Sequence, residues 1–329
     1  MMGTRVVVTG GGGFIGAHLV RRLVHDGWDV AVVDTMVRGD ASRLSDVIGE
    51  VELHSCDVRD QDALETVFKR AQLVIHLAAI NGTENFYKRP ELVLDVGLRG
   101  ALAVVNAGRA ADVPDLVVAS TAEVYQTPDV VPTPESVKLM LPDSLNPRYS
   151  YGGSKIASEL IAFNYGQDHY RKVQVFRPHN VYGPDMGWKH VIPQFITRAV
   201  TASQRVGSPV PFEIQGAGDE TRAFCFVDDV VAGILQMYAA GGHREIYHIG
   251  NDEEVTIRDL ASRVGAALNV ELDIRPGEPT VGGTNRRCPD IAKMRRLGYQ
   301  PRVSLDVGLE RTVGWYVAHT GDVVANELL

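Results

Sequence analysis

The chain has 329 residues, 45% of them hydrophobic, which suffices for a sizeable core in one large or two moderate domains. Its net charge is -8 and it has no basic block, so we expect no nucleic-acid partner. No apolar run has membrane-spanning length, and the first strand begins within a few residues, so we expect no membrane partner and no signal peptide. Three widely spaced cysteines match no disulfide framework or zinc site, and this favours the cytoplasm.

The chain opens with a β-branched run, Val6–Val8, that leads into a glycine cluster. Apolar residues at helical spacing follow, so the order is strand, turn and helix. Glycines suit a turn that bends sharply and lets the backbone approach a ligand. The N–H groups at the start of the helix then face a pyrophosphate. Two glycine registers fit this dinucleotide-binding pattern, Gly10/Gly13/Gly16 and Gly11/Gly13/Gly16.

A second strand, Asp29–Val33, ends at Asp34, about 20 residues beyond the glycines. An acid at this distance is placed to bind the ribose hydroxyls of a dinucleotide. Its charge repels the additional phosphate of NADP, so NAD is the favoured cofactor, although Arg38 lies close by and keeps NADP from being excluded. The alternative is an ordinary glycine-rich turn in which Asp34 caps a helix.

Strands and helices alternate through the first half of the chain. Hydrophobic periodicity predicts helices at 62–70, 90–111 and 154–170, and strands at 51–54, 72–79, 116–121 and 173–176. Alternation at these lengths implies parallel crossover units. We therefore expect an α/β fold with a doubly wound parallel sheet of the Rossmann type.

The composition of the chain changes after Arg177, where prolines and glycines become frequent. The segment 177–184 is predicted to be a loop. We expect strands at 224–229 and 246–250, helices at 230–240, 256–268 and 306–319, and a loop over 276–285. The expected division is an NAD-binding domain over 1–177, to which 225–250 returns, and a smaller C-terminal α/β substrate-binding cap over 178–224 and 251–329.

Two stretches carry groups suited to acid–base chemistry. Tyr151 and Lys155 are four residues apart, on one face near the start of a helix. An ammonium beside a phenol lowers the pKa of the phenol, so Tyr151 could act as a base near neutral pH. Thr121 and Glu123 follow a strand at the carboxyl edge of the sheet, where such sheets bind ligands. The alternatives are an accidental Tyr/Lys spacing and a threonine that only caps a turn.

Together these stretches resemble the extended short-chain dehydrogenase/reductase family, which includes the NAD-dependent nucleotide-sugar epimerases and dehydratases. The resemblance covers nearly the whole chain, from the glycine turn to the segment Arg287–Asp290. It implies that NAD is held by Gly10, Gly13, Phe14, Ile15, Gly16, Asp34, Asp57, Val58, Leu77, Ala78, Ala79, Ser120, Tyr151, Lys155 and Pro178.

The resemblance also implies a substrate and an assembly. Asn180, Arg222 and Arg287 would hold the sugar diphosphate, since arginine meets phosphate oxygens with two parallel donors. The two long helices at 90–111 and 154–170 would pair across a two-fold axis, giving a homodimer.

The chain departs from the family pattern at four positions. Gly97 stands where asparagine is frequent, and Gln126 where glycine is usual. Ala122 removes the first acid of the Asp-Glu pair of hexose 4,6-dehydratases, so their proton donor for water loss is missing. Asp185 stands where enzymes acting on UDP-glucuronate often carry arginine, which makes a sugar carboxylate a less expected ligand.

The mechanism that the resemblance implies is transient oxidation of a sugar hydroxyl, on the fourth carbon. Tyr151 takes the proton, Thr121 bridges, Lys155 binds the nicotinamide ribose, and a hydride passes to NAD. We expect epimerisation through the 4-keto sugar. The alternatives are dehydration, decarboxylation or 4-dehydrogenation with Glu123, and, from another class, a non-catalytic NAD-sensing or scaffold protein.

Overall fold

The computed structural model describes residues 3–205, 209–278 and 285–319. Its main sheet has seven parallel strands in the order β11-β6-β5-β4-β1-β2-β3. The strands are β1 (Arg5–Thr9), β2 (Asp29–Val33), β3 (Val51–His54), β4 (Leu73–His76), β5 (Asp115–Ala119), β6 (Lys172–Pro178) and β11 (Glu245–Ile249). The predicted doubly wound α/β fold is confirmed. The strand order reverses at β1, so the carboxyl ends of β1 and β4 flank the position where such sheets bind ligands.

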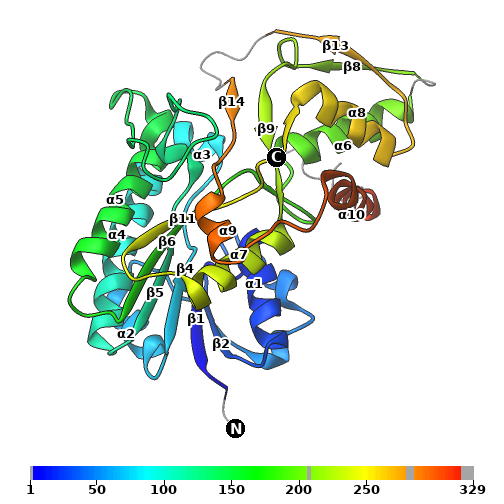
Figure 1. Cartoon of the computed structure of the whole chain (residues 1–329). Coiled ribbons are helices and arrows are strands. Elements are labelled where there is room, and N and C mark those ends of the chain that lie inside the picture. Colours follow the sequence, from blue (N-terminus) through cyan, green and yellow to red (C-terminus); the bar gives the residue numbers. More distant parts are fainter. Residues whose placement is uncertain (1–2, 206–208, 279–284, 320–329) are drawn as a thin grey trace.

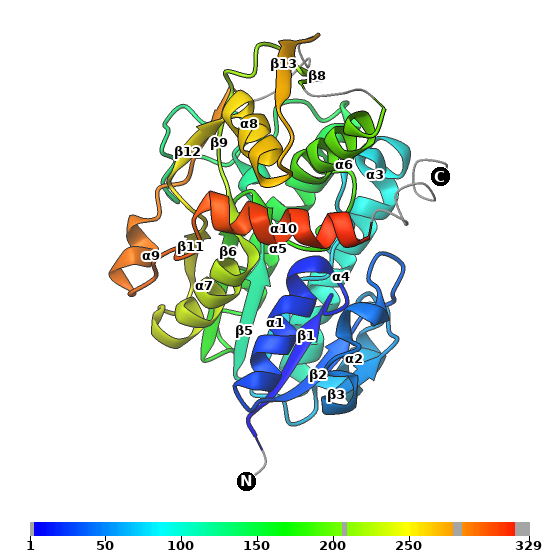
Figure 2. The same ribbon diagram turned by 90° about the vertical axis from the view of Figure 1, so that its right-hand side faces the viewer.

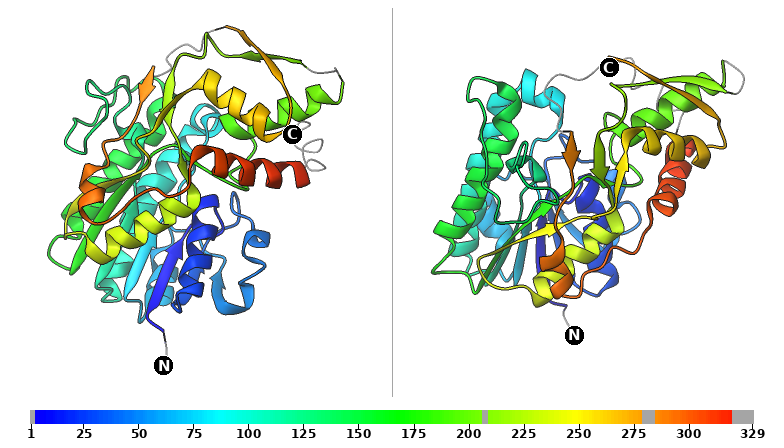
Figure 3. Two further views of the ribbon diagram at one scale, coloured as in Figure 1. Left: turned by 45° about the vertical axis from the view of Figure 1, so that its right-hand side comes forward. Right: turned by 45° about the horizontal axis from the view of Figure 1, so that its top comes forward.

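Helices cover both faces of this sheet (Figure 1). On one face pack α1 (Phe14–His25) and α7 (Val227–Ala240), and on the other α2 (Gln61–Phe68), α4 (Pro90–Ala110) and α5 (Ser150–Tyr165). The helix α1 shows the reason, since Leu19, Val20 and Leu23 form one buried apolar stripe against the strands. The two views of Figure 3 show the same three layers.

A smaller group of elements, called the cap here, lies beyond the carboxyl ends of the strands (Figure 1). Its core gathers Phe195, Phe212, Leu260 and Leu309 in a cluster separate from those of the main sheet. Figure 2 shows α10 crossing the molecule between α6 and α8 above it and α1 below it. The cap elements are α6 (Val191–Ser203), β8 (Val210–Ile214), β9 (Thr221–Ala223), β12 (Glu254–Thr256), α8 (Ile257–Ala267), β13 (Leu272–Pro276), β14 (Arg286–Arg287) and α10 (Leu305–Ala318).

The chain crosses between the main sheet and the cap several times. After β6, the short strand β7 (Val181–Tyr182) pairs with β10 (Cys225–Phe226), so the exit from the sheet and the return lie together. The chain then forms α7 on the face of α1 and β11 beside β6. A short helix, α9 (Ala292–Arg296), packs against β11 before the chain reaches α10.

Several predicted boundaries are shifted. The helix predicted over 154–170 is α5, which begins four residues earlier and ends at Tyr165. The strand predicted over 224–229 is confined to β10, because Asp228 and Asp229 lie in the first turn of α7, where the helix dipole favours acids. The strands β8 and β13 were not predicted, since each contains proline. Most of the loop predicted over 276–285 lies outside the described residues.

None of the helices in the described ranges combines the length and the apolar character that a membrane span requires.

Candidate active site

The glycine turn between β1 and α1 depends on residues without side chains. Gly10 has φ +76, and a Cβ there would lie 2.7 Å from the amide nitrogen of Ala78. A Cβ on Gly16 would overlap the carbonyl oxygen of Gly10. Gly11 does not have a positive φ, and its Cβ would meet only side-chain atoms of Val32 and Val20. Of the two predicted registers, the geometry therefore favours Gly10/Gly13/Gly16.

The first turn of α1 is suited to an anion. Gly13 is its N-cap, no side chain caps the helix, and no acid lies in the first turn. A helix start of this kind has unsatisfied N–H groups and partial positive charge. Phe14 packs against the cap core and Ile15 against the sheet core, so the turn lies where the two meet. The uncapped start and the side-chain-free turn fit the pyrophosphate of a dinucleotide.

The other predicted cofactor residues surround this turn. The carboxylate of Asp34 accepts hydrogen bonds from the amides of Gly12, at 3.0 Å, and Met36, at 2.9 Å. The amides of Leu77 and Ala78 bond the carbonyl and the hydroxyl oxygen of Thr9, at 3.0 and 3.5 Å. These contacts bring the ends of β1, β2 and β4 together.

Two further predicted cofactor residues follow β3. Asp57 binds Arg59 at 2.5 Å, and this guanidinium holds the pKa of the Asp57 carboxyl below its ordinary value. Val58 is buried, and a Cβ on Gly100 would lie 3.0 Å from its side chain. The backbone of this segment is therefore fixed against α4.

The structure brings Thr121, Tyr151 and Lys155 together. The side chain of Thr121 lies close enough to the Tyr151 phenol to act on its pKa, and the Lys155 ammonium lies 5.9 Å from the centre of the Tyr151 ring. Phe86, from α3 (Thr83–Lys88), stacks on Tyr151 with the ring centres 5.2 Å apart. Ala79 packs against the cluster that Phe86 and Tyr151 form with Val93, which connects the segment after β4 to this cluster.

The electrostatics correct one expectation. Burial raises the pKa of Tyr151, and so does the charge of Glu123, while the hydrogen bond with Thr121 and the charge of Arg38 act against this rise. The prediction of a phenol pKa lowered towards neutral is therefore wrong for this structure, in which the pKa of Tyr151 is raised above its ordinary value. The Lys155 ammonium donates instead to the carbonyl of Ala119 at 2.8 Å, and burial lowers its own pKa to about 8.

Glu123 lies in the same site. Its amide donates to the Thr121 hydroxyl oxygen at 3.2 Å, which leaves the hydroxyl hydrogen for another acceptor. Its charge acts both on Tyr151 and on Arg287 of the cap. A half-buried acid thus stands between the tyrosine and the cap.

The cap brings two arginines side by side. Arg222 of β9 and Arg287 of β14 are opposite each other in the strand pairing. Burial lowers the pKa of Arg222, and the neighbouring charge of Arg287 lowers it further. Two adjacent guanidinium groups repel each other, and an anion of high charge would relieve this repulsion. Asn180 has φ +38 and donates to the carbonyl of Ala223 at 2.9 Å, so it is tied to the same strand as Arg222.

Two predicted site residues, Ser120 and Pro178, lie at the carboxyl ends of the neighbouring strands β5 and β6. The hydroxyl of Ser120 donates to the buried carboxylate of Glu159. Pro178 ends β6, opposite Ile249 of β11. The motifs gave no indication of Glu159, although it comes one helical turn after Lys155. Phe86 and Arg38 were also missed as neighbours of Tyr151, and their sequence surroundings carry no signal for it.

Two of the departures from the family pattern, Gly97 and Gln126, are explained by local contacts. A Cβ on Gly97 would lie 2.7 Å from the side chain of Ser154, so α4 and α5 need glycine for their close approach. Gln126 takes the left-handed conformation with φ 53 where glycine is usual, and its amide group donates to the carbonyl of Glu123. This bond fixes the turn that carries Glu123.

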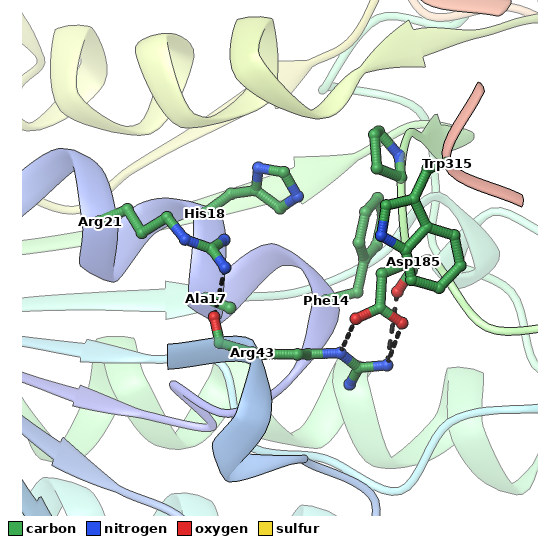
Figure 4. Close-up of a pocket in the computed structure, with 8 residues that line it drawn as sticks. Phe14, Ala17, His18, Arg21, Arg43, Asp185 and Trp315 are labelled. Atoms are coloured by element: carbon green, nitrogen blue, oxygen red, sulfur yellow. Dashed lines mark hydrogen bonds and ion pairs between the residues drawn. The ribbon is translucent and has the colours of Figure 1, made fainter. Parts of the chain in front are cut away.

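The fourth departure, Asp185, lines a cavity of about 170 Å³ on the outer side of α1 (Figure 4). The carboxylate of Asp185 accepts from the guanidinium of Arg43 at 2.6 and 2.7 Å. The same guanidinium donates to the carbonyl of Gly12 at 3.3 Å. Asp185 therefore links the segment after β7 to the glycine turn.

A doubly wound sheet with a glycine turn at its crossover, and a threonine, a tyrosine and a lysine beside it, defines a dinucleotide-dependent enzyme. The model of the NAD dependent epimerase/dehydratase family matches residues 6–250, and the chain belongs to this family, whose cofactor is NAD.

The relatives and solved structures to which this chain is similar include three kinds of enzyme. The chain is 30% identical over 313 residues to UDP-glucuronic acid decarboxylase 3 of Arabidopsis thaliana, covering 93% of this chain and 86% of the relative. A UDP-glucose 4-epimerase of Thermotoga maritima, solved with UDP-glucose, matches with TM-score 0.86 and 26% identity over 96% of this chain and 99% of that one. DesIV of Streptomyces venezuelae, a dTDP-glucose 4,6-dehydratase solved with NAD, matches with TM-score 0.84 and 30% identity over 96% and 98%.

Proposed function

We propose that the protein is an NAD-dependent 4-epimerase of a nucleotide-diphosphate sugar, acting through a transient 4-keto sugar. The observation that carries this proposal is the convergence of Thr121, Tyr151 and Lys155 in one buried group, with the Lys155 ammonium 5.9 Å from the centre of the Tyr151 ring. The arginine pair of the cap supports a diphosphate ligand, and the similar structure from Thermotoga maritima holds UDP-glucose.

The residues around the reacting carbon have separate tasks. Bound NAD would supply the hydride acceptor for oxidation of the sugar and the hydride donor for its reduction. Tyr151 takes the proton of the 4-hydroxyl and gives it back, and Thr121 bridges the phenol and the sugar oxygen. Lys155 provides positive charge near the phenolate and a donor for the nicotinamide ribose. Phe86 keeps the plane of the Tyr151 ring fixed.

Inversion requires that the keto sugar turns while the rest of the substrate stays bound. Arg222, Arg287 and Asn180 belong to or contact β9 and β14 of the cap, so they would hold the diphosphate away from the reacting carbon. The sugar could then rotate about its bonds to the diphosphate and present its other face. A 4-epimerase needs its substrate to be bound at the diphosphate, away from the sugar carbon that reacts.

The test is a panel of UDP-, GDP-, dTDP- and ADP-sugars, followed by mass spectrometry and chromatography of the products. An isomer of unchanged mass supports the 4-epimerase. Loss of water or of carbon dioxide would identify a dehydratase or a decarboxylase instead. A protein that binds NAD and converts none of the sugars would be a sensor or scaffold.

The position of Glu123 favours a second candidate, an enzyme that works on the carbon beside the ketone. Its charge acts on Tyr151 and on Arg287, so a carboxylate faces the space between catalytic residue and cap. In deuterated water, such an enzyme would incorporate deuterium beside the ketone carbon, and the Glu123→Gln variant would stall with NADH formed. A 4-epimerase incorporates none, and its Glu123→Gln variant still turns over.

We also infer a homodimer formed through α4 and α5. These helices pack on each other and leave Leu94, Leu160 and Tyr165 exposed. A four-helix contact between two copies would bury these side chains. A monomeric mass by light scattering at micromolar concentration would contradict this assembly.

We also infer which parts of the chain bind NAD and the nucleotide sugar, and where in the cell the protein acts. Residues 1–177 and 225–250 would bind NAD, and 178–224 and 251–329 the nucleotide sugar. The protein would act in the cytoplasm, in carbohydrate biosynthesis.

A further inference from the structure

Lys155 is 3% exposed, and one helical turn later Glu159 is also 3% exposed. The Glu159 carboxylate accepts two hydrogen bonds from Arg177 of β6, at 2.8 Å on Oε1 and 2.6 Å on Oε2. The hydroxyl of Ser120, next to the carbonyl that Lys155 binds, donates to the same Oε1. A buried acid is thus fixed by neutral and charged donors directly behind the catalytic pair.

The bonds of Arg177 continue away from the active site. Its Nη1 donates to the hydroxyl of Tyr125 and, at 3.2 Å, to the carbonyl of Glu135. The Tyr125 hydroxyl lies 2.6 Å from Nε2 of His248 on β11. Helix α5 is therefore connected to β6 and to the edge strand β11 through groups that are almost free of solvent.

Three titratable groups, His76, Tyr151 and Glu159, lie around Lys155. On β4, His76 is neutral because burial brings its pKa to about 3. On α5, the Tyr151 phenol is protonated because burial raises its pKa. Burial disfavours the ammonium of Lys155, and the charge of Glu159 is the interaction that favours it, leaving a pKa of about 8. Glu159 itself faces Arg177, Tyr125 and Ser120.

We propose that Glu159, one helical turn from Lys155 in α5 and equally buried, is a positioning residue that keeps the ammonium of Lys155 charged, while Arg177 and Ser120 hold the Glu159 carboxylate in its orientation. This inference deepens the proposed function, on which it rests for the role of Lys155. A merely structural ion pair would serve only stability or specificity of the fold. The two roles differ in one measurable property, the titration of Lys155.

The first experiment needs neither NAD nor a sugar. Protein labelled with ¹³C at the lysine Cε is titrated by NMR, and the Lys155→Met variant assigns the Lys155 signal. In the wild type we expect a midpoint near 8. Loss of a neighbouring opposite charge shifts a pKa by about 1–3 units, so in Glu159→Gln the midpoint should fall by this amount. In Glu159→Asp, which keeps the charge, the midpoint should lie close to the wild-type value.

The matched control is Tyr125→Phe. It removes the hydroxyl that Arg177 and His248 share but leaves the contacts of Glu159 with Arg177 and Ser120. We expect an unchanged Lys155 midpoint in this variant. If Tyr125→Phe shifts the midpoint as far as Glu159→Gln does, the effect comes from general loosening and the proposal is wrong.

The second experiment measures NAD affinity and kcat between pH 6 and 9.5. Both should fall at alkaline pH as Lys155 loses its proton, and we call this decline the alkaline limb of the pH profile. In Glu159→Gln the alkaline limb should move to lower pH by the same shift as the NMR midpoint. A folded Glu159→Gln protein with an unmoved midpoint and an unmoved limb overturns the proposal. The NMR shift without turnover of any nucleotide sugar would contradict only the proposed function.

Glu159→Gln could fail to fold, because it leaves Arg177 as an unpaired buried cation. The double variant Glu159→Gln/Arg177→Met removes both charges, and replacing a buried ion pair in this way is often neutral for stability. The charge of Glu159 is the interaction that favours the ammonium of Lys155, so the midpoint should again fall. A midpoint that stays near 8 in the double variant rejects the proposal as well.

Discussion

The glycine turn and the arginine pair are two candidate ligand-binding regions made in different ways. The turn is one continuous stretch, and its shape follows from missing side chains, as the contacts of Gly10 and Gly16 show. The arginine pair exists only because β9 and β14, distant in the sequence, become neighbours in the cap. The first region is encoded locally and the second by tertiary pairing. Substitutions in the two should therefore fail in different ways.

The largest effect should come from Tyr151→Phe, which touches neither region directly. The variant loses the proton-transfer group, so we expect kcat to fall by about 10²–10⁴. NAD affinity and the unfolding midpoint should stay close to those of the wild type, since the ring and its stacking on Phe86 remain. Stopped-flow absorbance of NADH measures the rate of hydride transfer, titration with NAD measures the affinity, and an unfolding curve gives the midpoint. Near-normal turnover would show that another group takes the proton.

Arg287→Met should break the second region alone. A hydrogen bond to a charged group contributes about 1.5–3 kcal/mol, so affinity for the nucleotide sugar should fall by about 10–100-fold. NAD affinity should not change. The control is Arg286→Met on the same strand, because this exposed guanidinium pairs with Glu254 at 2.6 Å. Calorimetric titration with the substrate's nucleoside diphosphate distinguishes the two variants, and equal losses would contradict a specific diphosphate site.

The smallest effects, on unfolding free energy, compare Gly10→Ala in the glycine turn with its control Gly27→Ala, which lies outside that turn between α1 and β2. Both glycines have positive φ, +76 and +82, so alanine should cost either about 1 kcal/mol of unfolding free energy. Nothing lies within 4 Å of a Cβ at Gly27, whereas at Gly10 the Cβ would meet the backbone of Ala78. Gly10→Ala should thus lose more stability in urea unfolding and also lose NAD binding. Equal stability and retained NAD binding in both variants would refute the steric role of Gly10.

The sequence was informative where local pattern determines structure. Alternating periodicity predicted the main sheet, and fixed spacing predicted the pairing of Tyr151 with Lys155 in one helix. The strands of the cap were missed or shortened, because proline and two-residue strands give no period to detect. The stacking of Phe86 and the burial of Glu159 depend on which elements meet, and no motif records this.

The late position of β11 has a consequence for synthesis on the ribosome. Its partner β6 is complete after Pro178, but β11 is translated only after α6, β8 and β9 of the cap. During this interval the outer edge of β6 has no strand beside it, and open edges of nascent sheets invite pairing with other chains. Chaperone demand during translation should therefore be greatest while the segment between β6 and β11 is being made.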